Sequence, residues 1–288
     1  MKNIDLIDNS ELSFDKYKQN INLLIQNKQI DKLKLLPNYF DITNNYWIVD
    51  KYIAMNGQVS PEFFPNTFDA YSDAIKHGYA LCIPVQKLDD DSIVCFSHKN
   101  ISKVLENTSG YLNKLTLAEL KELKLNEKGD IVPTLDEALD FVANKTPIII
   151  EINNEGMIGK FEDKVISSIL KYINTYNAYF NVAIISINPY TLQYCYQKAP
   201  YITRILKSGN FTEKMYGSIP TKKLKKLKLY KITHADFLAY SADLLPCRYV
   251  SKHKPVGIIA CNVTSQSKYL EVAPHADNII FNNFTPTI

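Results

Sequence analysis

Cysteine is scarce in this 288-residue sequence, which contains five, at positions 82, 95, 195, 247 and 261. They are odd in number, widely separated and mostly flanked by apolar residues, and no two of them form a C-x-x-C pair. These features argue against a disulfide framework or a zinc site, and they predict reduced thiols within a core.

Long apolar runs are also missing. No stretch approaches the roughly 18 apolar residues of a transmembrane helix, and residues 1–8 do not contain the apolar core of a signal peptide. We therefore expect a cytoplasmic protein without a transmembrane segment.

An excess of charge of one sign is absent as well. The sequence has 33 Lys and Arg against 30 Asp and Glu, for a formal net charge of +3. This balance predicts no nucleic-acid partner, because such partners require a broad basic surface. The phosphate-binding loops GxGxxG and GxxxxGK(S/T) do not occur, which argues against a nucleotide-binding fold. The hydrophobic fraction of 46% is ordinary for a globular protein.

Short β-rich runs alternate with helical stretches along most of the chain. The expected strands are 52–55, 80–85, 147–152, 182–186, 202–206, 236–240, 256–262 and 278–281. The expected helices between them are 66–77, 160–176, 189–198, 242–253 and 265–273. Eight strands that alternate with helices predict an α/β fold, a TIM (β/α)8 barrel, for which about 250 residues are typical.

The alternation is interrupted once, after the second strand. Polar residues 89–92 separate that strand from a second β-rich run at 93–97, which predicts a β-hairpin. The hairpin would return His98 to the rim of the barrel, where TIM barrels hold their functional residues.

Residues 1–48 precede the barrel pattern, and the barrel itself is expected over 49–288. Ser13 can cap a helix that carries Phe14 and Tyr17 on one face. We expect a short helical N-terminal extension. It either packs against the underside of the barrel or makes a dimer contact.

Several motifs between residues 52 and 153 follow one another in a recognisable order. They are YIAMNG (52–57), PNTF (65–68), IVCFSH (93–98), LTLAELKEL (115–123), VPTLDEAL (132–139) and IIIEIN (148–153). In order and spacing they resemble the glycerophosphodiester phosphodiesterase family. The resemblance implies a TIM barrel that cleaves phosphodiesters with a divalent ion, two histidines as base and acid, and basic groups that hold the phosphate.

The resemblance also places most functional positions of the family on unsuited side chains. These positions are Met55, Asn56, Pro65, Ile83, Val85, Lys99 and Asn153. Met55 and Asn56 stand for a His-Arg pair, and Pro65 stands for the Glu of a Pro-Glu-Asn-Thr turn, where Glu62 is a nearby substitute. Ile83 and Val85 stand for the two carboxylates of a Glu-Leu-Asp motif. We therefore expect at the rim either an apolar plug made by Met55, Ile83 and Val85 or an open polar pocket. The chain is thus identified as a degenerate member of the family.

Two functional side chains of the family are kept, His98 and Glu151. His98 either binds an anion or a proton, or it makes a local hydrogen bond. Glu151 lies in an apolar strand and needs a partner; it either pairs structurally, with Lys99 or a tyrosine at the rim, or serves the pocket. Asn262 is a further candidate for the pocket.

One carboxylate is a poor site for Mg²⁺ or Ca²⁺, because both ions need several oxygen ligands. We therefore expect no cofactor and a non-catalytic role, in which the rim binds a phospho-polyol or glycerophosphodiester-like ligand or an interaction partner. The alternative is a divergent phosphoric diester hydrolase that uses His98 and Glu151, and this alternative would require Mg²⁺ or Ca²⁺.

One basic cluster stands out, with six lysines between Lys222 and Lys231 that alternate with leucines. A basic amphipathic segment of this kind can contact an anionic surface. The other interpretation is a solvated helix whose leucines pack on the barrel.

Overall fold

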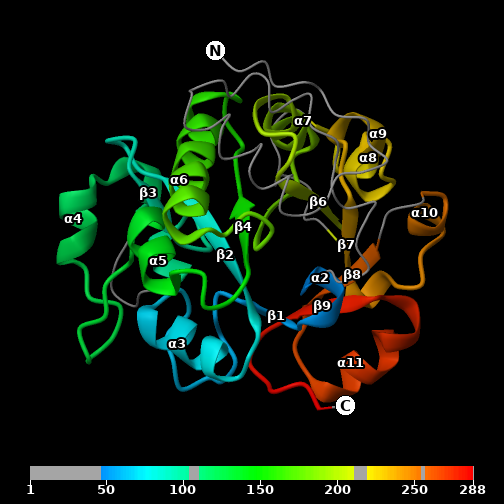
Figure 1. Cartoon of the computed structure of the whole chain (residues 1–288), viewed down its shortest axis with the longest axis horizontal. Coiled ribbons are helices and arrows are strands. Elements are labelled where there is room, and N and C mark those ends of the chain that lie inside the picture. Colours follow the sequence, from blue (N-terminus) through cyan, green and yellow to red (C-terminus); the bar gives the residue numbers. More distant parts are fainter. Residues whose placement is uncertain (1–46, 104–109, 211–218, 254–256, 288) are drawn as a thin grey trace, which may run out of the picture.

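The computed structural model describes residues 47–103, 110–210, 219–253 and 257–287. The predicted helical extension therefore lies, up to residue 46, outside the described residues. The described chain folds around a ring of parallel strands with helices on its outer side (Figure 1).

Eight parallel strands form the ring. They are β1 (Ile53–Met55), β2 (Ala80–Lys87), β4 (Ile148–Ile152), β5 (Val182–Ser186), β6 (Thr203–Ser208), β7 (Phe237–Ser241), β8 (Gly257–Val263) and β9 (Asn278–Phe281). Strand β1 pairs with both β2 and β9, which closes the ring. The predicted TIM barrel is confirmed, and all eight strands lie where the sequence indicated them.

Helices follow the strands on the outside of the ring. The longer ones are α3 (Phe68–Lys76), α5 (Leu135–Val142), α6 (Lys160–Tyr176), α7 (Pro189–Lys198) and α11 (Gln266–Val272). The shorter ones are α2 (Trp47–Asp50), α4 (Leu117–Glu122), α8 (Thr221–Lys225), α9 (Tyr230–Thr233) and α10 (Arg248–Ser251). None of the helices in these ranges has both the length and the apolar character that crossing a bilayer requires.

Local sequence determines where these helices begin and end. In α5, the Thr134 hydroxyl accepts a hydrogen bond from the Glu137 amide, and the Glu137 carboxylate accepts one from the Thr134 amide at 2.8 Å. This capping box pairs two backbone donors that the first turn would otherwise leave unpaired. Elsewhere the prediction of one helix over 242–253 is wrong. A 3-10 turn at Ala242–Leu244 and α10 replace it, because Pro246 has no amide hydrogen for a helix interior.

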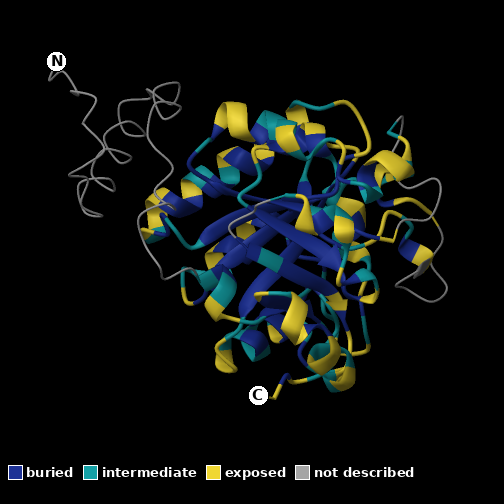
Figure 2. Ribbon diagram, turned by 90° about the vertical axis from the view of Figure 1, so that its right-hand side faces the viewer, coloured by how far each residue is buried: buried dark blue, intermediate teal, exposed yellow. Residues whose placement is uncertain are grey.

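The alternation of side chains along each strand divides the core into two layers. The inward side chains form the packed interior of the barrel: Ile53, Ala80, Cys82, Ile149, Ala183, Ile185, Ile205, Phe237, Ala239, Ile259, Cys261 and Ile280. The outward side chains form a larger layer beneath the helices. Figure 2 shows the strands, most of whose residues are buried, at the centre of the molecule.

Helix α2 closes the amino-terminal end of the barrel. Ile48 is 1% exposed and belongs to the barrel interior. The Trp47 indole donates a hydrogen bond to the carbonyl of Phe180 at 2.7 Å, and Asn278 donates to the carbonyls of Ile48 and Lys51. With one end closed, the other end of the barrel is where a ligand can enter.

The predicted hairpin after the second strand is confirmed. Strand β3 (Ile93–Cys95) pairs antiparallel with the end of β2, and residues 89–92 make the turn. The hairpin and the segment after it share a small core, made by Leu88, Val94, Phe96, Ile101, Leu112, Leu120, Leu125 and Val132. This lobe stands beside the open end of the barrel and supplies one wall of the site described next.

Candidate functional site

A pocket of about 640 Å³ opens at the carboxyl ends of the strands. Its walls come from the ends of several ring strands and from the segment that follows the hairpin, including His98, Lys99 and Tyr111. This is the end of a TIM barrel at which binding and catalytic residues collect.

The floor of the pocket is made by Met55, Glu151, Lys207 and Cys261. They come from β1, β4, β6 and β8, which are alternate strands of the ring. In a TIM barrel, the inward residues of alternate strands share one layer. Glu151 and Lys207 therefore approach each other although 56 positions separate them in the sequence.

The Lys207 ammonium donates a hydrogen bond to Glu151 Oε1 at 2.7 Å. The two side chains are 15% and 3% exposed. Burial alone would lower the pKa of Lys207, but the Glu151 carboxylate raises it above its usual value. The lysine is therefore charged at neutral pH. The second carboxylate oxygen, Oε2, is buried and has no hydrogen-bond partner among the described residues.

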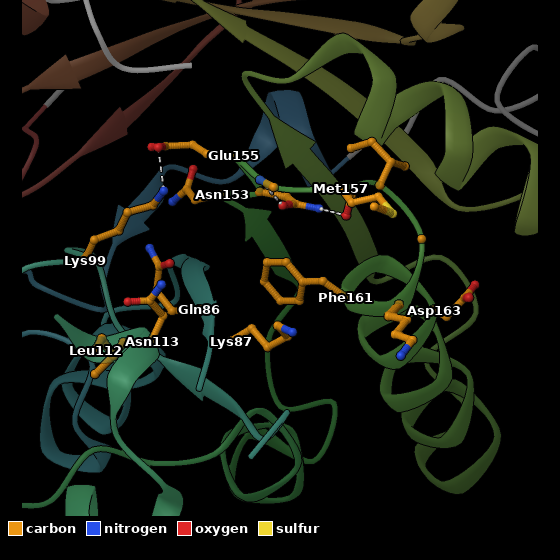
Figure 3. Close-up of a pocket in the computed structure, with 15 residues that line it drawn as sticks. Gln86, Lys87, Lys99, Leu112, Asn113, Asn153, Glu155, Met157, Phe161 and Asp163 are labelled. Carbon is orange, nitrogen blue, oxygen red and sulfur yellow. Dashed lines mark hydrogen bonds and ion pairs between the residues drawn. The ribbon is translucent and has the colours of Figure 1, made fainter. Parts of the chain in front are cut away.

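The expected partners of Glu151 were Lys99 or a tyrosine at the rim, and the structure shows Lys207 instead. Sequence reasoning missed Lys207. The signal was present, because a charged residue within the apolar run of β6 must find a partner when it is buried. Lys99 pairs with Glu155 across the rim (Figure 3).

Of the two alternatives for the rim, the structure shows an open pocket, and the placement of Ile83 and Val85 at pocket-facing positions is wrong by one residue. Both are fully buried in the outer layer, beneath the helices, and neither lines the pocket. Pro84 and Gln86 line it instead, and Pro84 is in register with Glu151. A shift of one residue along a strand reverses the face on which every side chain lies. The two pocket-facing residues are still not carboxylates, but they leave the pocket open.

Asn56 and Met55 both line the pocket, and Asn56 is held by a chain of hydrogen bonds. Its Oδ1 accepts from the Ser97 hydroxyl at 2.9 Å, and that hydroxyl accepts from the Asn66 amide at 3.0 Å. These bonds connect the loop after β1 to the segment that returns from the hairpin. Asn56 therefore fixes the rim where the resemblance expected an arginine.

The other candidates divide between the pocket and the surface. His98, Asn153 and Asn262 line the pocket. Glu62 is exposed, and neither Glu62 nor Pro65 lines it. The thiol of Cys261 lies in the floor, and burial raises its pKa to about 11, with Lys207 acting in the opposite direction. This thiol is therefore protonated at neutral pH and is a poor nucleophile.

A second cavity of about 540 Å³ adjoins the first and shares Gln86, Lys99, Asn153 and Glu155 with it. Figure 3 shows it between the end of the β2–β3 hairpin and the loop that leads into α6. Phe161 and Leu112 give it apolar surface, and the Lys99–Glu155 ion pair stands at its boundary with the main pocket. A ligand larger than the main pocket could extend into this space.

The basic cluster at 222–231 is divided between two short helices, α8 and α9. Leu224 and Leu227 are 4% and 2% exposed, whereas Lys222 and Lys223 are exposed. These leucines pack on the protein and are not available to enter a membrane. The geometry agrees with a solvated face, and an electrostatic contact with an anionic surface stays a prediction.

The pocket does not fit a divalent metal ion. No cluster of three or more His, Cys, Asp or Glu suitable for an ion occurs within the described ranges. Its two carboxylates, Glu151 and Glu155, are each paired with a lysine. Because each carboxylate is neutralised by its lysine, the two ion pairs offer no net negative charge to a divalent ion, which needs several oxygen ligands.

Comparisons with known proteins agree with this architecture. A sequence model of the glycerophosphoryl diester phosphodiesterase family matches residues 58–252, which is more than half of the chain. The chain belongs to this family. It is 30% identical over 105 residues to glycerophosphodiester phosphodiesterase GDPD4 of Arabidopsis thaliana, a match that covers 34% of this chain and 32% of that protein. The chain thus spans about a third of the length of this relative.

Solved structures of the family share the fold. A phosphodiesterase of Oleispira antarctica, in complex with the product sn-glycerol-3-phosphate, superposes with a TM-score of 0.64 at 18% identity, over 81% of this chain and 93% of that one. A putative glycerophosphoryl diester phosphodiesterase of Agrobacterium tumefaciens gives a TM-score of 0.65 at 12% identity, over 81% and 94%. At these identities the likeness establishes the fold.

Proposed function

We propose that this member of the family binds a glycerophosphodiester-like or phospho-polyol ligand at the mouth of its barrel and does not hydrolyse it by a metal-dependent route. The observation that carries this proposal is the Glu151–Lys207 ion pair. The retained carboxylate of the family is already neutralised by a lysine of the chain itself.

The composition of the pocket wall supports a polar ligand with an anionic group. Lys207 and Lys99 present ammonium donors, His98 lies at the rim, and the amides of Asn153 and Asn262 are suited to hydroxyl groups. The relative from Oleispira antarctica holds sn-glycerol-3-phosphate. That compound is therefore the first ligand to test.

The absence of hydrolysis follows from the side chains that remain. In-line displacement needs a base and an acid on opposite sides of the phosphorus, and the resemblance places only one histidine at the site, His98. Met55, on the floor, has no group that could supply the other proton transfer. The loss of a single acid or base costs about 10²- to 10⁴-fold in rate.

The experiment has two arms. Binding of sn-glycerol 3-phosphate and glycerophosphocholine is measured by isothermal titration calorimetry, and release of choline from glycerophosphocholine is measured with Mg²⁺, Ca²⁺ or Mn²⁺ present. We expect binding without turnover above the buffer rate. Turnover that disappears in a His98→Ala variant would instead establish the divergent hydrolase that uses His98 and Glu151. The cytoplasmic location expected from the sequence stays a prediction.

A further inference from the structure

The Lys207 ammonium is largely shielded from solvent, charged and incompletely bonded. An ammonium has three N–H donors, and among the described residues one of them is used, by Glu151 Oε1 at 2.7 Å. The lysine lines the main pocket, at the layer of the barrel nearest the opening. A partly buried cation with donors left over, at the base of an open pocket, is a place for an anionic oxygen.

A second buried ion pair of the same barrel shows what a purely structural pair looks like. Arg204 is 2% exposed and pairs with Asp236 at 3.1 Å. Four of its five N–H donors are used, by Asp236 and by the backbone carbonyls of Pro200, Ile202 and His234, and it lines neither of the two cavities described above. Arg204 thus uses most of its donors within the protein, whereas Lys207, on the same strand, uses one of three among the described residues.

The carboxylate of the pair also has an oxygen that accepts no hydrogen bond from the described residues. Glu151 Oε2 is buried without a hydrogen-bond partner among the described residues, although the side chain belongs to the pocket floor. A buried carboxylate oxygen is stabilised by a donor. A ligand hydroxyl next to the phosphate would be such a donor, because Oε1 of the same carboxylate already holds the ammonium.

We propose that the Lys207–Glu151 pair does the work of phosphate recognition that the family gives to a metal ion, and that it recognises a phosphate with a neighbouring hydroxyl. Lys207 Nζ binds a phosphate oxygen, and Glu151 Oε2 accepts the hydrogen bond of the adjacent hydroxyl. Recognition then requires no divalent cation. This inference rests on the proposed binding function and specifies its chemistry.

The test is calorimetry at pH 7 with the whole chain and two ligands. One is sn-glycerol 3-phosphate, which has a hydroxyl beside its phosphate-bearing carbon. The other is the monophosphate of propane-1,3-diol, which does not. Each titration is run in EDTA and again in Mg²⁺. The wild type should bind the glycerol phosphate equally in both buffers and the analogue about 10-fold more weakly, which corresponds to the loss of one hydrogen bond to a charged group.

Three variants assign the effect to the ammonium. Lys207→Met should bind the glycerol phosphate about 10- to 100-fold more weakly. Because that variant leaves Glu151 unpaired and could fail to fold, the double variant Lys207→Met with Glu151→Gln removes both charges and should bind as weakly. Lys171→Met is the matched control, since Lys171 pairs with Asp136 on the exposed surface of α6, and its affinity should equal that of the wild type.

The outcomes separate the inference from the function on which it rests. If the wild type binds neither ligand in either buffer, the proposed function is wrong and the inference falls with it. If the wild type binds only in Mg²⁺, or if the double variant binds as the wild type does, the barrel binds its ligand but the role of Lys207 is refuted. Equal affinity for the two ligands in the wild type would refute the role of Glu151 Oε2.

Discussion

Removal of Lys207 should destabilise the protein far more than removal of an exposed lysine. In the Lys207→Met variant the Glu151 carboxylate, 3% exposed, loses its partner. An unpaired buried charge of this kind costs about 3–5 kcal/mol of the free energy of unfolding. For a domain of this size, 1 kcal/mol corresponds to about 2–4 °C in melting temperature, so the expected loss is about 6–20 °C.

The Glu151→Gln variant should cost less, about 1–3 kcal/mol, because Lys207 is 15% exposed and its ammonium can reach the pocket opening. The double variant leaves neither charge unpaired, so its cost should fall well below the sum of the two single costs. Urea denaturation of all four proteins gives the coupling free energy of the pair, which we expect at about 2–3 kcal/mol.

The same cycle on Lys171 and Asp136 is the control. Their side chains are 63% and 49% exposed, and an exposed pair typically couples by about 0.2–1 kcal/mol. If the unfolding free energies of the Lys207 and Glu151 variants add within about 0.5 kcal/mol, the two side chains are not coupled as a buried ion pair would be. Lys207 would then not take the place of a metal ion beside Glu151.

Three further predictions concern the scaffold. The stability changes are measured by urea denaturation, and the ligand affinity in the third is measured by calorimetry. Gly57→Ala should cost at least about 2 kcal/mol, because φ is +69° and the new Cβ would lie 2.7 Å from a ring atom in α3; Gly78→Ala, with φ at +76° and open space, should cost about 1 kcal/mol, and equal costs would contradict this reasoning. Ile83→Glu should cost more than about 3 kcal/mol because Ile83 is fully buried in the outer layer, and Gln86→Glu less than about 2 kcal/mol because Gln86 lines the pocket; the reverse order would restore the original alignment of β2. Arg204→Met should cost about 3–5 kcal/mol and leave ligand affinity unchanged, and a loss of affinity would place Arg204 at the site.

The sequence predicted the ring of strands well because each strand is a compact β-rich run bounded by polar residues. It predicted less well which face of a strand a residue occupies. In β2, Ile83 and Pro84 are both compatible with burial, since a strand of a parallel sheet is covered on both faces. The sequence of such a strand does not show whether Ile83 and Val85 or Pro84 and Gln86 face the pocket. The residues that line the pocket in the structure decide between the two.

The Glu151–Lys207 pair could not be predicted as a pair for a different reason. The two residues are 56 positions apart in the sequence. They meet because β4 and β6 flank β5 in the ring, and the inward side chains of such alternate strands share one layer of the barrel interior. From the sequence alone, Glu151 in one apolar strand and Lys207 in another each need a partner, and nothing indicates that the two partner each other. The sequence also offered Lys99, which the structure pairs with Glu155.

The most direct test of the central idea, that a lysine of the chain stands where the family uses a metal ion, is a divalent titration followed by the melting temperature. A site with a dissociation constant of about 10 μM would stabilise the protein by about 2.7 kcal/mol at 1 mM ion, or about 5–11 °C. We predict that Mg²⁺ and Ca²⁺ at 1 mM shift the melting temperature by less than about 1 °C relative to EDTA. A saturable rise of about 5 °C or more with either ion, abolished by Glu151→Gln, would contradict the account.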